Sequence, residues 1–93
     1  MRDFQRHIGE LYLAKDRRRG VEGTFLWLME EVGELAEAVR RKDRAALEEE
    51  MADVAAWLAS LANLLEVDLQ AAMEKKYPAT CARCGRKPCA CAE

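Results

Sequence analysis

The chain has 93 residues, of which 51% are hydrophobic, and its net charge at pH 7 is -2. A domain of this size buries only a modest core, so we expect it to self-associate as a homodimer or a homotetramer. Residues 1–77 carry more acidic than basic side chains, which disfavours a nucleic acid as the main partner. The sequence contains no segment typical of a membrane span or a signal peptide, so we expect a cytoplasmic protein without membrane contact.

Apolar residues recur at helical spacing through most of the chain, and no strand pattern is present. Four helices are predicted, over about residues 4–19, 25–42, 44–65 and 69–76. Thr24, Asp43 and Asp68 are the expected N-caps of the last three helices, and Pro78 is the expected stop. The predicted fold is all-α: an antiparallel helical bundle of about four helices, completed by oligomerisation, with a short metal-binding C-terminal tail.

The second and third predicted helices each carry one apolar stripe with an acidic edge. The stripes are formed by Leu28, Val32, Leu35 and Val39, and by Leu47, Met51, Val54, Leu58, Leu61 and Leu65. The acidic edges are formed by Glu31 with Glu34 and by Glu50 with Asp53, because residues three apart share a helix face. When the two helices pack antiparallel, these edges can face each other across one groove.

Carboxylates brought together in this way repel each other unless a cation offsets their charge. Mg²⁺ and Mn²⁺ prefer oxygen ligands, so the pattern favours a divalent-metal site. Glu30 lies farther round its helix, where it is a ligand, a base acting on water or a solvated side chain. The alternative for the whole acidic set is a solvated helix face, which we expect for Glu48 and Glu49.

The acidic residues lie in two motifs, Leu-Met-Glu-Glu-Val-Gly-Glu-Leu-Ala-Glu-Ala at residues 28–38 and Glu-Met-Ala-Asp-Val-Ala-Ala-Trp at residues 50–57. With these motifs the chain, over about residues 1–77, resembles the MazG-like nucleotide pyrophosphohydrolases of the all-α NTP pyrophosphatase superfamily. The resemblance implies Mg²⁺-dependent hydrolysis of nucleoside triphosphates between the α and β phosphates, giving a monophosphate and pyrophosphate. It also implies that Glu31, Glu34, Glu50 and Asp53 coordinate Mg²⁺ and that Glu30 is a further catalytic ligand or orients water.

Several other side chains are candidates for substrate binding. Trp27 and Trp57 fall on the acidic edges, where they either stack on a nucleobase or fill a core or subunit interface. Asn63 is polar on an otherwise apolar helix and either binds substrate or caps that helix. Lys75, Lys76 and the cluster Arg17–Arg19 are candidates for phosphate contacts, from the same or a neighbouring subunit, or are solvated surface charges.

Two alternative functions are compatible with the same motifs. One is the phosphoribosyl-ATP pyrophosphohydrolase of histidine synthesis, which belongs to the same superfamily. The other is a non-catalytic helical dimerisation or zinc interaction module, although the complete acidic set speaks against it.

All four cysteines lie in the tail at residues 78–93, as Cys81-Ala-Arg-Cys84-Gly and Cys89-Ala-Cys91. The first half is typical of a zinc knuckle, and four thiolates complete a tetrahedral structural Zn²⁺ site. The alternatives are a redox-active thiol pair or two disulfides, and a cytosolic location disfavours the disulfides. The tail has no core of its own, so a bound metal would be what folds it.

Overall fold

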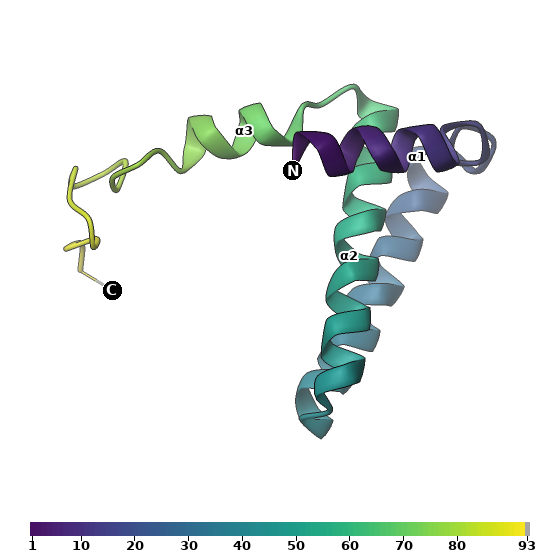
Figure 1. Ribbon diagram of the computed structural model, residues 1–93, viewed down its shortest axis with the longest axis horizontal. Helices are drawn as coiled ribbons and strands as arrows, with labels where there is room; N and C mark the ends of the chain where they lie inside the picture. The colour runs from purple at the N-terminus through teal and green to yellow at the C-terminus, as the bar shows by residue number, and fades with distance from the viewer. Residues whose placement is uncertain (93) are drawn as a thin grey trace.

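The computed structural model describes residues 1–92 and contains three helices, α1 (Arg2–Arg41), α2 (Arg44–Leu65) and α3 (Leu69–Lys76). No strand occurs in this part of the chain, so the all-α prediction is confirmed. The second half of α1 and α2 run side by side in opposite directions, and the first half of α1 crosses their end (Figure 1). The first two of the four predicted helices are joined as the single element α1, which is interrupted at Gly20, so the described part of the chain has three helices and the four-helix bundle is not confirmed.

The two halves of α1 meet at Gly20, whose backbone is non-helical (φ 86°, ψ 169°). Only glycine adopts this region readily, so the chain changes direction within one residue and helical structure continues on both sides. For that reason Thr24 is not the N-cap that the sequence suggested. It lies inside α1, is fully buried, and its hydroxyl accepts a hydrogen bond from Arg19 Nη1 at 3.3 Å.

Gly20→Ala should destabilise the protein by about 1–3 kcal/mol, because a Cβ atom is strained at this backbone conformation. Urea unfolding followed by circular dichroism measures the change. Gly33→Ala is the matched control, since Gly33 is an exposed residue within a helix and an added Cβ meets nothing within 4 Å. That control should gain about 0.5–1 kcal/mol. Equal stability of Gly20→Ala and wild type would contradict the assignment of the turn to Gly20.

The two predicted N-caps that follow are confirmed. The Asp43 side chain accepts a hydrogen bond from the Ala46 N–H at 3.2 Å, and the Asp68 side chain accepts one from the Ala71 N–H at 3.1 Å. These caps start α2 and α3 directly after short connections. The tight turn at residues 42–43 is what makes α1 and α2 antiparallel neighbours.

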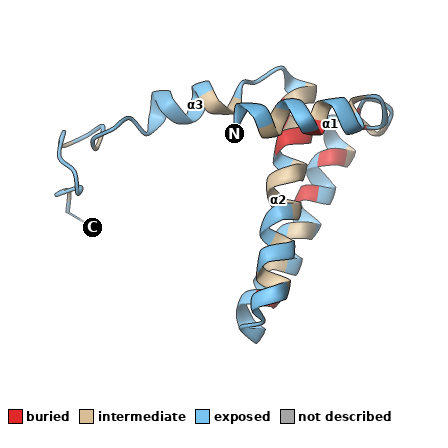
Figure 2. Ribbon diagram, in the orientation of Figure 1, coloured by how far each residue is buried: buried red, intermediate tan, exposed pale blue. Residues whose placement is uncertain are grey.

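The core consists mainly of small side chains. The buried apolar residues are Ile8, Leu28, Ala38, Ala59 and Ala62. Most of the buried positions gather where the first half of α1 crosses the helical pair (Figure 2). Much of the two predicted stripes is exposed in the single chain, including Val39 (56% exposed) and Met51. Two paired helices shield only part of each other's surface, so covering the stripes requires a further layer.

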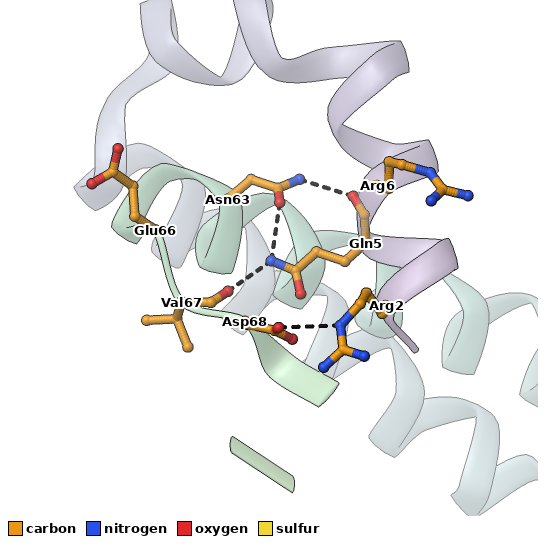
Figure 3. A pocket seen from close by; sticks show the side chains of 7 residues that line it. All are labelled: Arg2, Gln5, Arg6, Asn63, Glu66, Val67 and Asp68. Atoms are coloured by element: carbon orange, nitrogen blue, oxygen red, sulfur yellow. Dashed lines mark hydrogen bonds and ion pairs between the residues drawn. The ribbon is translucent and has the colours of Figure 1, made fainter. Parts of the chain in front are cut away.

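A hydrogen-bonded network joins the start of α1 to the end of α2, beside a cavity of about 300 Å³ (Figure 3). Gln5 Nε2 donates to Asn63 Oδ1 at 3.0 Å and to the Val67 carbonyl at 2.7 Å. Asn63 Nδ2 donates to the Gln5 carbonyl at 3.1 Å, and the Leu69 N–H donates to Gln5 Oε1 at 3.0 Å. The amide groups of Gln5 and Asn63 therefore hold all three helices together at this corner.

α3 and the tail extend away from the helical pair (Figure 1). Residues 71–80 are all exposed, and α3 contacts only the start of the chain to any extent. Among the described helices, none has the length and apolar character required to cross a membrane.

Candidate functional site

Three of the predicted acidic residues converge between α1 and α2. Glu31 comes from α1, Glu50 and Asp53 come from α2, and each offers a carboxylate oxygen that lies within 4.8 Å of the others. All three side chains are half-buried. The antiparallel pairing of the two helices thus brings their acidic edges together, which is the arrangement expected from the helical spacing.

One buried oxygen atom of this carboxylate cluster (Glu31, Glu50 and Asp53) has no hydrogen-bond partner in the part of the chain that the structure describes. Glu50 Oε2 is buried and accepts no hydrogen bond from any described residue. A buried carboxylate oxygen without a donor is costly, and a cation removes that cost. Because every donor atom is a carboxylate oxygen, the site fits a hard divalent cation such as Mg²⁺ or Mn²⁺.

The electrostatics of Glu31 lead to the same conclusion. The pKa of its carboxyl is raised from 4.5 to about 7, mainly by burial and next by a hydrogen bond with the Glu50 carboxyl. The negative charges of Asp53, Glu50 and Glu34 also contribute to this pKa shift. Without a cation, the cluster therefore retains a proton near neutral pH, which reduces the repulsion between its members.

The other two predicted acids lie at the margin of the cluster. Glu34 is exposed and does not belong to the convergent group of three, but its negative charge contributes to the raised pKa of Glu31. Glu30 is also exposed and lies outside the group. The structure therefore brings three of the five acids into direct proximity.

The two tryptophan side chains lie one helical turn from the carboxylate cluster. Trp27 precedes Glu31 by four residues, and Trp57 follows Asp53 by four residues. The two indole rings are stacked, with centroids 5.8 Å apart and planes inclined by 11°. The Arg19 guanidinium lies 4.7 Å from the centroid of the Trp57 ring. The Trp57 ring therefore contacts both Trp27 and Arg19, whereas 45% of the Trp27 surface is exposed to solvent.

A groove of about 350 Å³ lies next to Asp53 and Trp57. Its lining includes Trp57 and Ser60 from α2, together with Tyr12, Lys15 and Arg19 from α1. The lining of the groove therefore combines carboxylate, aromatic and cationic side chains. Its volume is within the usual range for sites that bind small molecules.

Sequence reasoning missed Asp16, which also lines this groove. Asp16 is 1% exposed; its Oδ1 accepts a hydrogen bond from Arg19 Nη1 at 2.8 Å, and its Oδ2 has no partner among the described residues. The segment Lys15–Arg19 looks like a charged helix surface, and the spacing of Asp16 and Arg19 is common on exposed helices. Of the predicted cluster Arg17–Arg19, only Arg19 is turned inward.

The remaining substrate candidates lie elsewhere. Asn63 is committed to the network with Gln5 described above. Lys75 and Lys76 are exposed on α3, and Lys76 Nζ lies 5.8 Å from the centroid of the Tyr77 ring. Because α3 extends away from the helical pair, these lysines lie apart from the carboxylate cluster of the same chain (Figure 1).

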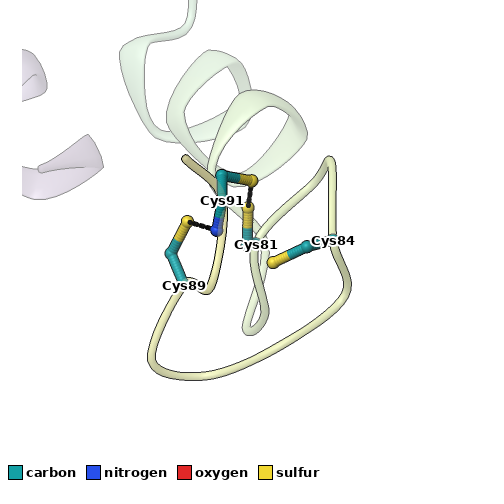
Figure 4. Close-up of side chains that lie close together, drawn as sticks. All are labelled: Cys81, Cys84, Cys89 and Cys91. Atoms are coloured by element: carbon teal, nitrogen blue, oxygen red, sulfur yellow. Dashed lines mark hydrogen bonds between the residues drawn. The ribbon is translucent and has the colours of Figure 1, made fainter. Parts of the chain in front are cut away.

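The four cysteines form a second group of potential metal ligands. The sulfur atoms of Cys81, Cys84, Cys89 and Cys91 all lie within 4.8 Å of one another (Figure 4). Backbone N–H groups of Cys84 and Arg83 lower the pKa of Cys81 to about 6. Hydrogen bonds with the neighbouring thiols raise the pKa of Cys91 to about 11. The thiols therefore share their protons within one compact group.

Fold and site together describe an all-helical protein in which a carboxylate cluster and a groove lined by Trp57 lie between the helices. Residues 19–87 match the MazG nucleotide pyrophosphohydrolase domain, and this match covers more than half of the chain. The chain therefore belongs to the MazG nucleotide pyrophosphohydrolase family, which confirms the resemblance seen in the sequence, and it is in general terms a nucleotide pyrophosphohydrolase. No curated protein matches the chain.

Proposed function

We propose that this protein hydrolyses nucleoside triphosphates between the α and β phosphates, releasing a nucleoside monophosphate and pyrophosphate, with Mg²⁺ or Mn²⁺ bound at the carboxylate cluster. The observation that carries the proposal is the convergence of Glu31, Glu50 and Asp53 around a buried oxygen that has no partner. The groove that Asp53 lines supplies space for the substrate.

In this proposal the carboxylates of Glu31, Glu50 and Asp53 hold the metal, and Glu34 adds a ligand or negative charge at the open side. A divalent ion bound there supplies charge stabilisation for the attacked phosphoryl group and for the leaving pyrophosphate. Glu30 is exposed next to this centre, where its carboxylate can orient the attacking water or complete the ligand set. Glu31 must lose its proton before it binds a cation.

The groove suggests how the rest of the substrate is held. Lys15 and Arg19 present positive charge to phosphate oxygens, and the phosphates are the charged part of the substrate. The exposed Trp27 ring offers a stacking surface for a nucleobase, continuous with Trp57. Lys76 would contact a substrate only from a neighbouring subunit, since α3 extends away from the site of its own chain.

The test is a panel of standard and modified nucleoside triphosphates incubated with Mg²⁺ or Mn²⁺, with both pyrophosphate and monophosphate measured. We expect the two products in equal amounts and no release after chelation of the metal. Release of inorganic phosphate and a diphosphate would contradict the proposed bond. If no triphosphate is hydrolysed, turnover of phosphoribosyl-ATP would indicate the enzyme of histidine synthesis, and no turnover at all would indicate a non-catalytic module.

We also propose that the protein assembles as a homodimer or homotetramer. Apolar side chains are exposed along both long helices, among them Leu26, which is 68% exposed. Contiguous apolar surface on a small soluble protein is typical of a subunit interface. Sedimentation velocity should give a mass at least twice that of one chain, and a single-chain mass at micromolar concentration would contradict this proposal.

The pKa of Glu31 gives a pH-dependent prediction for the metal. Because this pKa is raised from 4.5 to about 7 in the folded chain, the metal-free protein loses stability as the pH rises through that window. A divalent cation binds the ionised form, so Mn²⁺ should raise the melting temperature more at pH about 8 than at pH about 5.5. When the free Mn²⁺ concentration is a hundred times the Kd, the free energy of unfolding should increase by about 2.7 kcal/mol.

Calorimetry with and without Mn²⁺ measures this difference, and Glu31→Gln is the matched variant. The amide has no proton to lose in this range, so the variant should show a smaller dependence of metal-free stability on pH. An equal effect of Mn²⁺ at both pH values in wild type would contradict the role of Glu31.

A further inference from the structure

The C-terminal tail is folded into a compact loop around its sulfur atoms. The Cys81 N–H donates to the Arg86 carbonyl at 3.0 Å, and the Gly85 N–H donates to the Cys81 carbonyl at 2.8 Å. Gly85 has a positive φ of 69°, which glycine permits without strain. These bonds turn the chain back on itself, and the sulfur atoms of Cys81 and Cys84 lie close together inside the loop (Figure 4).

The spacing of the sulfur atoms fits a single tetrahedral metal. A Zn–S bond of about 2.3 Å places neighbouring sulfurs of a four-thiolate site about 3.8 Å apart. The Sγ atoms of Cys81 and Cys91 are 3.7 Å apart, and all four sulfurs lie within 4.8 Å of one another. Each sulfur is thus close to the other three, whereas disulfides would join the sulfurs in two separate pairs.

The backbone around the cysteines is arranged for thiolates. The Ala90 N–H donates to the Cys84 sulfur at 3.4 Å, and the Cys91 N–H donates to the Cys89 sulfur at 3.4 Å. Four thiolates around a divalent ion leave a net charge of two minus, and the tail contains three basic residues, Arg83, Arg86 and Lys87, that offset it.

The tail has no other source of stability. None of the described residues after position 76 is buried, so no hydrophobic core holds the loop. A segment of this kind folds only when a cross-link or a metal holds it together. One bound ion at the centre of the four sulfurs would account for both the loop geometry and the stability of a segment without a core.

We propose that Cys81, Cys84, Cys89 and Cys91 bind one zinc ion as a closed, structural four-thiolate site. The site lies apart from the carboxylate cluster, and its last two ligands fall outside the family match at residues 19–87. It is thus an addition to the nucleotide-hydrolysing part of the chain, and its zinc has no open position for a substrate.

The test is the metal content of the full-length protein, purified under reducing conditions and measured by mass spectrometry of the elements. We expect one zinc per chain, lost in each of four single Cys→Ser variants. Glu50→Gln should retain its zinc, so this readout is independent of nucleotide hydrolysis. Zinc-free protein with four titratable thiols, protein with two disulfides, or iron in place of zinc would each overturn the proposal.

Replacement of the ion by Co²⁺ reports the ligand set directly. A four-thiolate tetrahedral site should give intense sulfur-to-cobalt absorption, which weakens in each Cys→Ser variant. These are the only cysteines of the chain, so every sulfur signal arises from this loop. A cobalt spectrum typical of octahedral oxygen ligation, unchanged in the Cys→Ser variants, would contradict the assignment.

Discussion

Glu50→Gln and Asp53→Asn should each lower kcat/KM for metal-dependent triphosphate hydrolysis by roughly 100- to 1,000-fold. Each amide keeps the shape of the original side chain but removes a negative charge from the cluster. At Glu50 it also replaces the carboxylate whose buried Oε2 lacks a partner. Release of pyrophosphate under saturating Mg²⁺ measures the loss of activity.

Glu49→Gln is the matched control, because Glu49 is an exposed neighbour on the same helix and should retain wild-type activity. Thermal unfolding without metal distinguishes lost chemistry from lost folding. Removing one of several mutually repelling carboxylates should leave the metal-free fold at least as stable as wild type. Full activity in either cluster variant would refute the assignment of the metal centre.

Arg19→Ala should destabilise the protein by about 2–3 kcal/mol, because it leaves the buried Asp16 carboxylate without its cation. Asp16 is 1% exposed and lies 2.8 Å from Arg19 Nη1, which also donates to the buried Thr24 hydroxyl. The Arg19 side chain is 27% exposed, so we expect less than the full penalty for breaking a buried ion pair. Chemical denaturation at neutral pH measures the change.

Arg18→Ala is the control for this prediction, since Arg18 is exposed and should change stability by less than about 0.5 kcal/mol. The double variant Asp16→Ala/Arg19→Ala should be less destabilised than the sum of its single variants, because neither charge is then left alone. Strict additivity would show that the two residues do not act as a pair.

Features that depend on a few neighbouring residues could be predicted from the sequence. Asp43 and Asp68 cap helices through bonds three residues away, so the local pattern located both starts correctly. The sequence also predicted an interruption of the helix near Gly20, but it did not predict that helical structure resumes directly after this residue. Whether a glycine ends a helix or bends it depends on what the two halves pack against, and the sequence does not state those contacts.

Most features that depend on distant residues could not be predicted. Asn63 is hydrogen-bonded to Gln5, which is 58 residues away, and the buried Asp16 lines a groove together with Trp57 and Ser60 of α2. Helical periodicity placed Glu31, Glu50 and Asp53 on facing edges. These three carboxylates lie close together, whereas Glu30 and Glu34 do not join them, because of how the two helices are aligned. That alignment depends on helix packing, which the periodicity alone does not specify.

The stacked indoles have a practical consequence. Trp27 and Trp57 are the only tryptophans of the chain, so its indole emission arises one helical turn from the carboxylate cluster. Two stacked indole rings at 5.8 Å should couple electronically and give a paired circular dichroism band in the far ultraviolet. The protein thus carries its own optical reporter, through which occupancy of the neighbouring groove can be titrated without a label.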